Sequence, residues 1–139
     1  MFERWKEKRE QTKARNMAIL ESRYWREHAL LRHCIEVMRG SCTVAPMELH
    51  EAAVAVVNIA LQEDTWTSTS QVSEQFLAQN IYIVWDNEKI PVLKAPRELA
   101  IENLPAITAV AAKTFLVSET LDRIIWLDAN GHIQLYSIA

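Results

Sequence analysis

Residues 81–93 read IYIVWDNEKIPVL, and this stretch decides the fold class that the sequence predicts. Runs of apolar, β-branched and aromatic residues stand on both sides of the polar residues 86–89, which is the pattern of a β-hairpin. Pro91 cannot donate a backbone hydrogen bond, so its strand is expected at a sheet edge or at a bulge. We therefore place a first hairpin at residues 81–94.

The C-terminal residues 123–138 repeat this signal as RIIWLDANGHIQLYSI. Asn-Gly between alternating apolar runs is a strong signal for a two-residue hairpin loop, so Asn130 and Gly131 are expected to form the turn. A calcium loop is excluded, because Gly131 comes at its fourth position rather than its sixth and too few oxygen ligands follow Asp128. The likeness of the two hairpins reflects either an internal duplication or only the chemistry that hairpins share.

Most of the remaining chain favours helices, since helix-forming residues are frequent and there are only two glycines. Residues 17–80 are expected to be largely helical. Within them the very apolar segment AAVAVVNIAL, residues 52–61, predicts a helix buried at the centre of the fold. Residues 97–120 are expected to form a second helical region, which Pro105 divides into a short and a longer helix.

These elements predict one α+β domain over residues 1–139. A long N-terminal helix leads into a helical layer, and the two hairpins form a small antiparallel sheet against that layer. Residues 1–16 are polar on all sides, so they are expected to be a basic helical extension of the domain.

Charge is distributed unevenly along the chain. Residues 1–40 hold ten Lys and Arg against six Asp and Glu, a balance of +4, whereas residues 41–139 hold five against twelve, a balance of −7. The acidic body would suit a partner protein with a basic surface. The basic N-terminal helix would suit the acidic body itself, the partner, or a second copy of the chain in a homodimer.

Several functional classes find no support in the residues. The sequence has no Gly-rich phosphate loop, dinucleotide fingerprint or nucleophile motif, so we expect a protein that is not an enzyme and has no cofactor. His33, Cys34, Cys42 and His50 do not have the spacing of zinc ligands, so no metal site is expected. The charged N-terminus and the short apolar runs indicate neither a secretory signal nor a membrane span, and we expect a soluble, cytoplasmic protein.

Binding to another protein is the leading functional hypothesis. Both faces of the strands in both hairpins are apolar, whereas a sheet with one face in water alternates apolar and polar residues. Either helices cover both faces, or a partner covers one of them. Aromatic residues are typical anchors of interfaces. The candidate anchors are Trp66, Tyr82, Trp85, Trp126 and Tyr136. The alternative for each is that its side chain fills the core.

These observations indicate a small protein-binding module, such as an inhibitor, an immunity protein, a chaperone or an adaptor, of the type found in phages or mobile elements. The alternative is a regulator that binds nucleic acid through the basic N-terminal helix, with Arg4, Lys8 and Arg15 neutralising phosphates. Glutamates interleave these basic residues and the body is acidic, which makes nucleic acid the weaker hypothesis.

Overall fold

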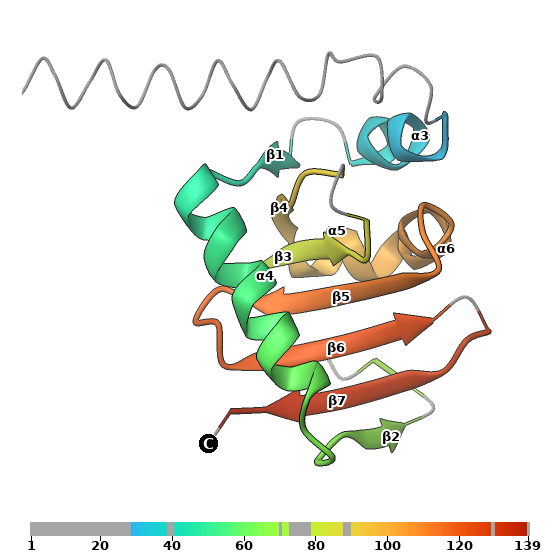
Figure 1. The fold of residues 1–139 in the computed structure, drawn as a ribbon. Helices are drawn as coiled ribbons and strands as arrows, with labels where there is room; N and C mark the ends of the chain where they lie inside the picture. The colour runs from blue at the N-terminus through green and yellow to red at the C-terminus, as the bar shows by residue number, and fades with distance from the viewer. Residues whose placement is uncertain are drawn as a thin grey trace, which may run out of the picture.

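The computed structural model describes residues 29–38, 41–69, 71–72, 79–87, 90–128 and 130–138. The elements in chain order are α3 (Ala29–Val37), β1 (Thr43–Val44), α4 (Met47–Leu61), β2 (Thr67–Thr69), β3 (Asn80–Trp85), β4 (Leu93–Pro96), α5 (Arg97–Glu102), α6 (Leu104–Thr108), β5 (Lys113–Ser118), β6 (Arg123–Asp128) and β7 (Ile133–Ser137). Helices and one antiparallel sheet confirm the predicted α+β class (Figure 1).

The sheet has seven strands in the order β1-β4-β3-β5-β6-β7-β2, and every neighbouring pair is antiparallel. β3 pairs with β4, where Ile83 lies opposite Leu93, and β6 pairs with β7, where Trp126 lies opposite Gln134. The two predicted hairpins are therefore present. The sheet is nevertheless larger than the two hairpins, because β5 joins them at the centre while β1 and β2 extend its edges.

The largest correction concerns residues 113–118, which we expected to lie in a helix that continues to residue 120. α6 ends at Thr108, and β5 then runs between β3 and β6 with all of its residues after Lys113 buried. A central strand that is covered on both faces reads as a continuous apolar run. Periodicity alone cannot distinguish such a run from a buried helix, which is why the prediction was wrong here.

Helices cover both faces of the sheet. We call the face beneath α4 the α4 face, and its buried strand residues are Tyr82, Val84, Phe115, Val117, Ile124 and Tyr136. On the opposite face α3, α5 and α6 pack against Ile81, Ile83, Trp85, Leu116, Ile125 and Leu127. The sequence left two explanations for strands without a polar face. For these buried positions, the explanation is that the protein's own helices cover the sheet. Trp85 and Trp126 lie on opposite faces, although the two hairpins have similar sequences.

α4 forms where the sequence predicts a helix, but it is not buried at the centre of the fold. The helix crosses one face of the sheet at the surface of the molecule (Figure 1), and its buried residues are Ala53, Val57 and Ala60. Leu49, Val54 and Val56 are partly buried beside them and pack against the same cluster. Ala55 and Ile59 on the outer side of the helix are exposed, and the core does not explain them.

Other predicted helical segments are only partly within the described residues. α3 is the described part of the expected long N-terminal helix, whereas the basic extension at residues 1–16 lies outside the described residues. The short strands β1 and β2 interrupt the region 17–80 that we expected to be helical. Strands of two and three residues at sheet edges are too short to leave a periodic signal in the sequence.

Candidate protein-binding surface

Three of the five candidate aromatic anchors lie in the core. Tyr82 and Trp85 are 3% and 4% exposed on opposite faces of β3, and Tyr136 on β7 is 8% exposed. The indole N–H of Trp85 donates a hydrogen bond to the carbonyl oxygen of Ile107 at 2.9 Å, which ties α6 to the end of β3. Burial, together with nearby Glu119, raises the pKa of Tyr82 above its ordinary value. These surroundings favour the alternative that the three side chains fill the core.

The other two anchors, Trp66 and Trp126, are half-buried on the α4 face. Their ring centroids lie 5.4 Å apart with the rings edge to face, and the Trp66 ring also lies 5.3 Å from the ring of Tyr136. The indole N–H of Trp66 donates to the carbonyl oxygen of Ala60 at 2.8 Å. Trp66 lies in the loop between α4 and β2, and from there it fastens the end of α4 to β6 and β7.

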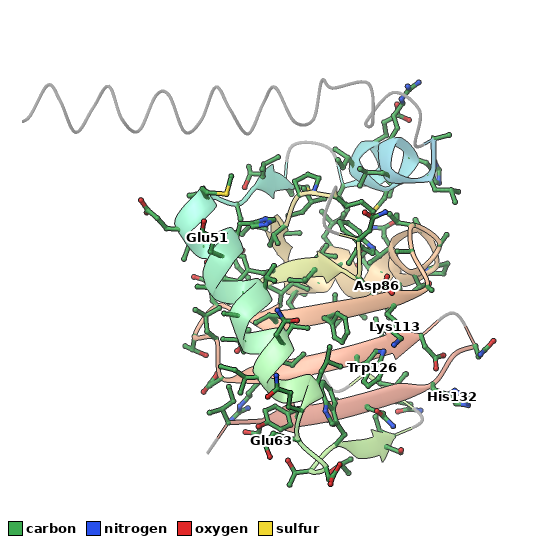
Figure 2. The ribbon with its side chains drawn as sticks, in the orientation of Figure 1. Glu51, Glu63, Asp86, Lys113, Trp126 and His132 are labelled. Carbon is green, nitrogen blue, oxygen red and sulfur yellow. The ribbon has the colours of Figure 1, made fainter. Side chains whose placement is uncertain are left out.

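Lys113 closes one side of this aromatic group. Its Nζ lies 5.3 Å from the ring centroid of Trp126, within the range of a cation–π contact (Figure 2). The indole nitrogen of Trp126 is buried, and no hydrogen-bond partner for it is found among the described residues. Asp86 is adjacent, since its carboxylate accepts a hydrogen bond from the backbone N–H of Lys113 at 3.2 Å. This end of the α4 face therefore carries charges of both signs.

The outer side of α4 forms a continuous surface that the sequence reasoning missed. We call it the α4 stripe, and its exposed residues are Glu48, Glu51, Ala55, Asn58, Ile59 and Gln62. Steps of three and four residues bring these positions onto one side of a helix. Ile59 is 55% exposed, more than any other large apolar residue in the described part of the chain. Ala55 lies one turn before it, so the middle of the stripe is apolar.

Carboxylates stand at both ends of the α4 stripe. Glu48 and Glu51 lie in the first half of α4, and Glu63 and Asp64 follow its end; all four are exposed. Figure 2 shows Glu51 and Glu63 at opposite ends of the helix. None of the four forms an ion pair with a residue that the structure describes.

The sequence around the stripe contains no basic residue to balance these charges. Residues 41–88 hold seven carboxylates and not one Lys or Arg. A count of charges in short windows would have found this run, whereas a division of the chain at residue 40 concealed how acidic this part of the body is.

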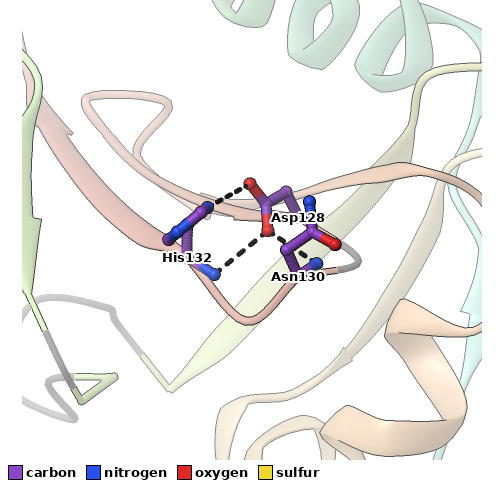
Figure 3. Close-up of polar contacts among 3 residues, drawn as sticks. All are labelled: Asp128, Asn130 and His132. Atoms are coloured by element: carbon purple, nitrogen blue, oxygen red, sulfur yellow. Dashed lines mark hydrogen bonds and ion pairs between the residues drawn. The ribbon is translucent and has the colours of Figure 1, made fainter.

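The Asp128–His132 turn is a closed structural unit (Figure 3). Asp128 Oδ1 accepts hydrogen bonds from the backbone N–H groups of Asn130 and His132 at 2.8 and 3.0 Å, and His132 Nδ1 lies 3.0 Å from Oδ2. The hydrogen bond from the His132 backbone is the main cause that lowers the pKa of Asp128. Gly131 has a φ of +83°, as expected at this turn.

The turn differs in length from the prediction. The backbone N–H of Asp128 donates to the carbonyl of His132, so three residues rather than two form the loop. Both carboxylate oxygens of Asp128 contact Asn130 or His132 within the turn, which agrees with the exclusion of a calcium loop.

Of the residues considered for metal binding, Cys34 and Cys42 belong to the same core cluster, whereas His50 lies on α4. Burial raises the pKa values of Cys34 and Cys42 to about 12, and for Cys34 the neighbouring Cys42 adds to the effect. Both thiols are therefore protonated at neutral pH and are poor nucleophiles. His50 accepts a hydrogen bond from the backbone N–H of Val92 at 3.3 Å. Within the described residues, no group of three or more His, Cys, Asp or Glu side chains could hold a metal ion.

The nucleic-acid hypothesis rests on Arg4, Lys8 and Arg15, which lie outside the described residues. The homodimer predicted through the N-terminal helix also depends largely on that part of the chain. In the segments that the structure describes, no helix combines the length and the apolar character that a membrane crossing requires.

Comparison with known proteins identifies the family. No curated protein matches the chain. Residues 29–136, well over half of the chain, match the family described as CdiI immunity protein EcoliA0-like. Among the kinds of binding module that the sequence predicted, this match identifies an immunity protein. It also confirms that the protein is not an enzyme. The chain belongs to the CdiI immunity protein family, whose members bind and neutralise the toxin domain of a contact-dependent inhibition system.

Proposed function

We propose that this immunity protein neutralises its toxin by binding a basic surface of the toxin domain. The observation that carries the proposal is the run of seven carboxylates without a Lys or Arg over residues 41–88. Like charges that are held close together repel each other and lower the stability of the folded protein. Basic side chains of a partner would offset that repulsion and would attract the carboxylates across the interface.

Charge complementarity would also make neutralisation fast. Opposite potentials steer two proteins toward each other and raise the association rate constant well above that of an uncharged pair. An immunity protein benefits from this, because it must capture the toxin before the toxin reaches its target. Trp66 and Trp126 remain in this proposal as the two predicted anchors whose side chains are partly accessible. A cytoplasmic site of action, expected from the sequence, is also part of it.

Measurement of binding between the full chain and its cognate toxin domain at increasing ionic strength tests the proposal. Salt screens exposed charges over about 10 Å at 0.1 M, so the association rate constant should fall steeply as salt is raised from about 0.01 to 1 M. The dissociation rate constant should change much less. A complex that forms at a rate independent of salt would contradict a basic toxin surface. Absence of any complex at low salt would contradict the proposed function as a whole.

A further inference from the structure

We propose that the α4 stripe is the surface on which the toxin domain docks, with Ile59 as its apolar anchor. The carboxylates at the two ends of the stripe would pair with basic side chains of the toxin. This inference rests on the proposed function and adds the location of the binding surface. It is drawn from three features of α4, and the stability of the fold does not explain the first two.

The first feature is the exposure of Ile59. α4 is seated on the sheet through Ala53, Val57 and Ala60, which are 0 to 4% exposed, so the packing of the helix does not require a large apolar residue on its outer side. A single exposed apolar residue is ordinary. Ile59 and Ala55, however, form an apolar centre one turn long within a strongly acidic surface. An apolar centre with a charged rim is the usual anatomy of a protein interface.

The second feature is the position of the acidic residues relative to the helix. The C-terminal end of a helix carries a partial negative charge, so an acidic residue there costs about 0.3–1 kcal/mol, while a basic residue would stabilise it. Glu63 and Asp64 stand just after this end of α4, and the last turn has no basic residue. Residue types that lower stability at their positions are expected where those residues serve function.

The third feature is the rigidity of the stripe. The hydrogen bond from Trp66 to the carbonyl of Ala60 and the contact of its ring with Trp126 fix the last turn of α4 on the sheet. A preformed surface loses less conformational entropy on binding. From Glu51 to Leu61, the last residue of α4, the helix rises about 15 Å, and Glu63 lies just beyond it. The toxin surface that fits would present two groups of basic residues at about that separation.

Other exposed features fit a toxin surface less well. Leu30 and Val37 on α3 are 49% and 38% exposed, but they border residues that the structure does not describe, so their exposure shows no free surface. The end of the α4 face beside Trp126 combines Lys113 with Asp86 and therefore has no single sign of charge. The α4 stripe combines an apolar centre with charge of one sign.

Two variants of the full chain and two matched controls test the proposal. Ile59→Gln removes the apolar anchor and places a good helix former there, and Ile138→Gln is its control at an exposed isoleucine outside α4. The double variant Glu51→Lys with Glu63→Lys reverses charge at both ends of the stripe. Its control, Glu36→Lys with Glu102→Lys, makes the same change in net charge at exposed positions of α3 and α5. All six substitutions are at exposed side chains, and far-UV circular dichroism and thermal unfolding check that each of the four variants is folded.

The stripe variants should lose affinity for the cognate toxin domain, and the controls should not. Ile59→Gln should weaken binding about 30-fold, mainly through faster dissociation, as expected for a central anchor. The charge reversal at the stripe should slow association about 10-fold or more at low salt. Wild-type affinity in both stripe variants would overturn the inference while leaving the proposed function intact. Equal losses in the matched controls would overturn it as well, because the effect would then not be local to α4. A wild-type chain that does not bind the toxin domain would refute the proposed function and the inference together.

Discussion

Substitution of Trp66 should separate the contribution of its hydrogen bond from that of its ring. The indole N–H donates to the carbonyl oxygen of Ala60 at 2.8 Å, near the end of α4. The ring lies edge to face against Trp126 at 5.4 Å and tilted against Tyr136 at 5.3 Å. Trp66→Ala removes all three interactions, whereas Trp66→Phe removes the hydrogen bond and keeps an aromatic ring beside the other two.

The expected changes in the free energy of unfolding follow from these contacts. Each aromatic pair contributes about 1 kcal/mol, and a hydrogen bond contributes about 1 kcal/mol net. Trp66→Ala should therefore lower the free energy of unfolding by about 3 kcal/mol, and Trp66→Phe by about 1 kcal/mol. A loss of about 3 kcal/mol is a large part of the 5–15 kcal/mol that stabilises a typical domain.

Urea denaturation followed by far-UV circular dichroism measures both changes without depending on tryptophan fluorescence. The dependence of the free energy on urea should keep its slope in both variants, so that the midpoints report stability alone. Equal losses in the two variants would show that the ring contacts contribute nothing and that the hydrogen bond accounts for the whole effect. A loss below about 0.5 kcal/mol for Trp66→Ala would refute the idea that Trp66 fastens α4 to the sheet.

Two further predictions concern single polar groups. Thr114 on β5 is fully buried, and its hydroxyl has no hydrogen-bond partner among the described residues. Thr114→Val should therefore raise the free energy of unfolding by about 1 kcal/mol, whereas Thr114→Ser should lower it. A Thr114→Val variant that urea denaturation shows to be less stable than the wild type would contradict this. Burial lowers the pKa of His50 below 6.5, although Glu51 opposes the shift. Between the lowered pKa and 6.5 the unfolded chain binds a proton that the folded protein does not, so stability should fall as pH decreases through 6.5. His50→Gln should reduce this slope in stability measurements between pH 7 and 5, and an unchanged slope would count against a role for His50.

The sequence predicted those parts of the fold that depend on local chemistry. The hairpins at β3–β4 and β6–β7 were found because turn residues separate apolar runs, and both features are local. β5 was missed because its side chains are buried on both faces, so its residues show neither alternation nor a helical period. The edges β1 and β2 exist only through pairing with β4 and β7, which are distant in sequence.

The candidate site was harder to predict, because exposure is a property of the assembled fold. Strands without a polar face correctly indicated that something covers both faces, but they did not say whether helices or a partner did so. Tyr82 and Trp85 were proposed as anchors from their residue type, and the helices that bury them are not visible in the sequence around β3. The acidic run at residues 41–88 was visible in the sequence, but its arrangement around an exposed Ile59 was not.

The error about α4 leads directly to the proposed binding surface. A helix that is apolar on nearly every side is expected to be buried on every side, because apolar surface in water is costly. α4 is buried on one side only, and Ile59 remains exposed on its outer side. Most of the other exposed positions of α4 are acidic or polar, which favours a partner with basic groups around an apolar centre. A membership in a family of toxin-binding proteins supplies a partner for that surface. We infer that the apolar pattern behind the wrong prediction for α4 reflects binding of another protein. A loss of toxin affinity in Ile59→Gln would support this inference.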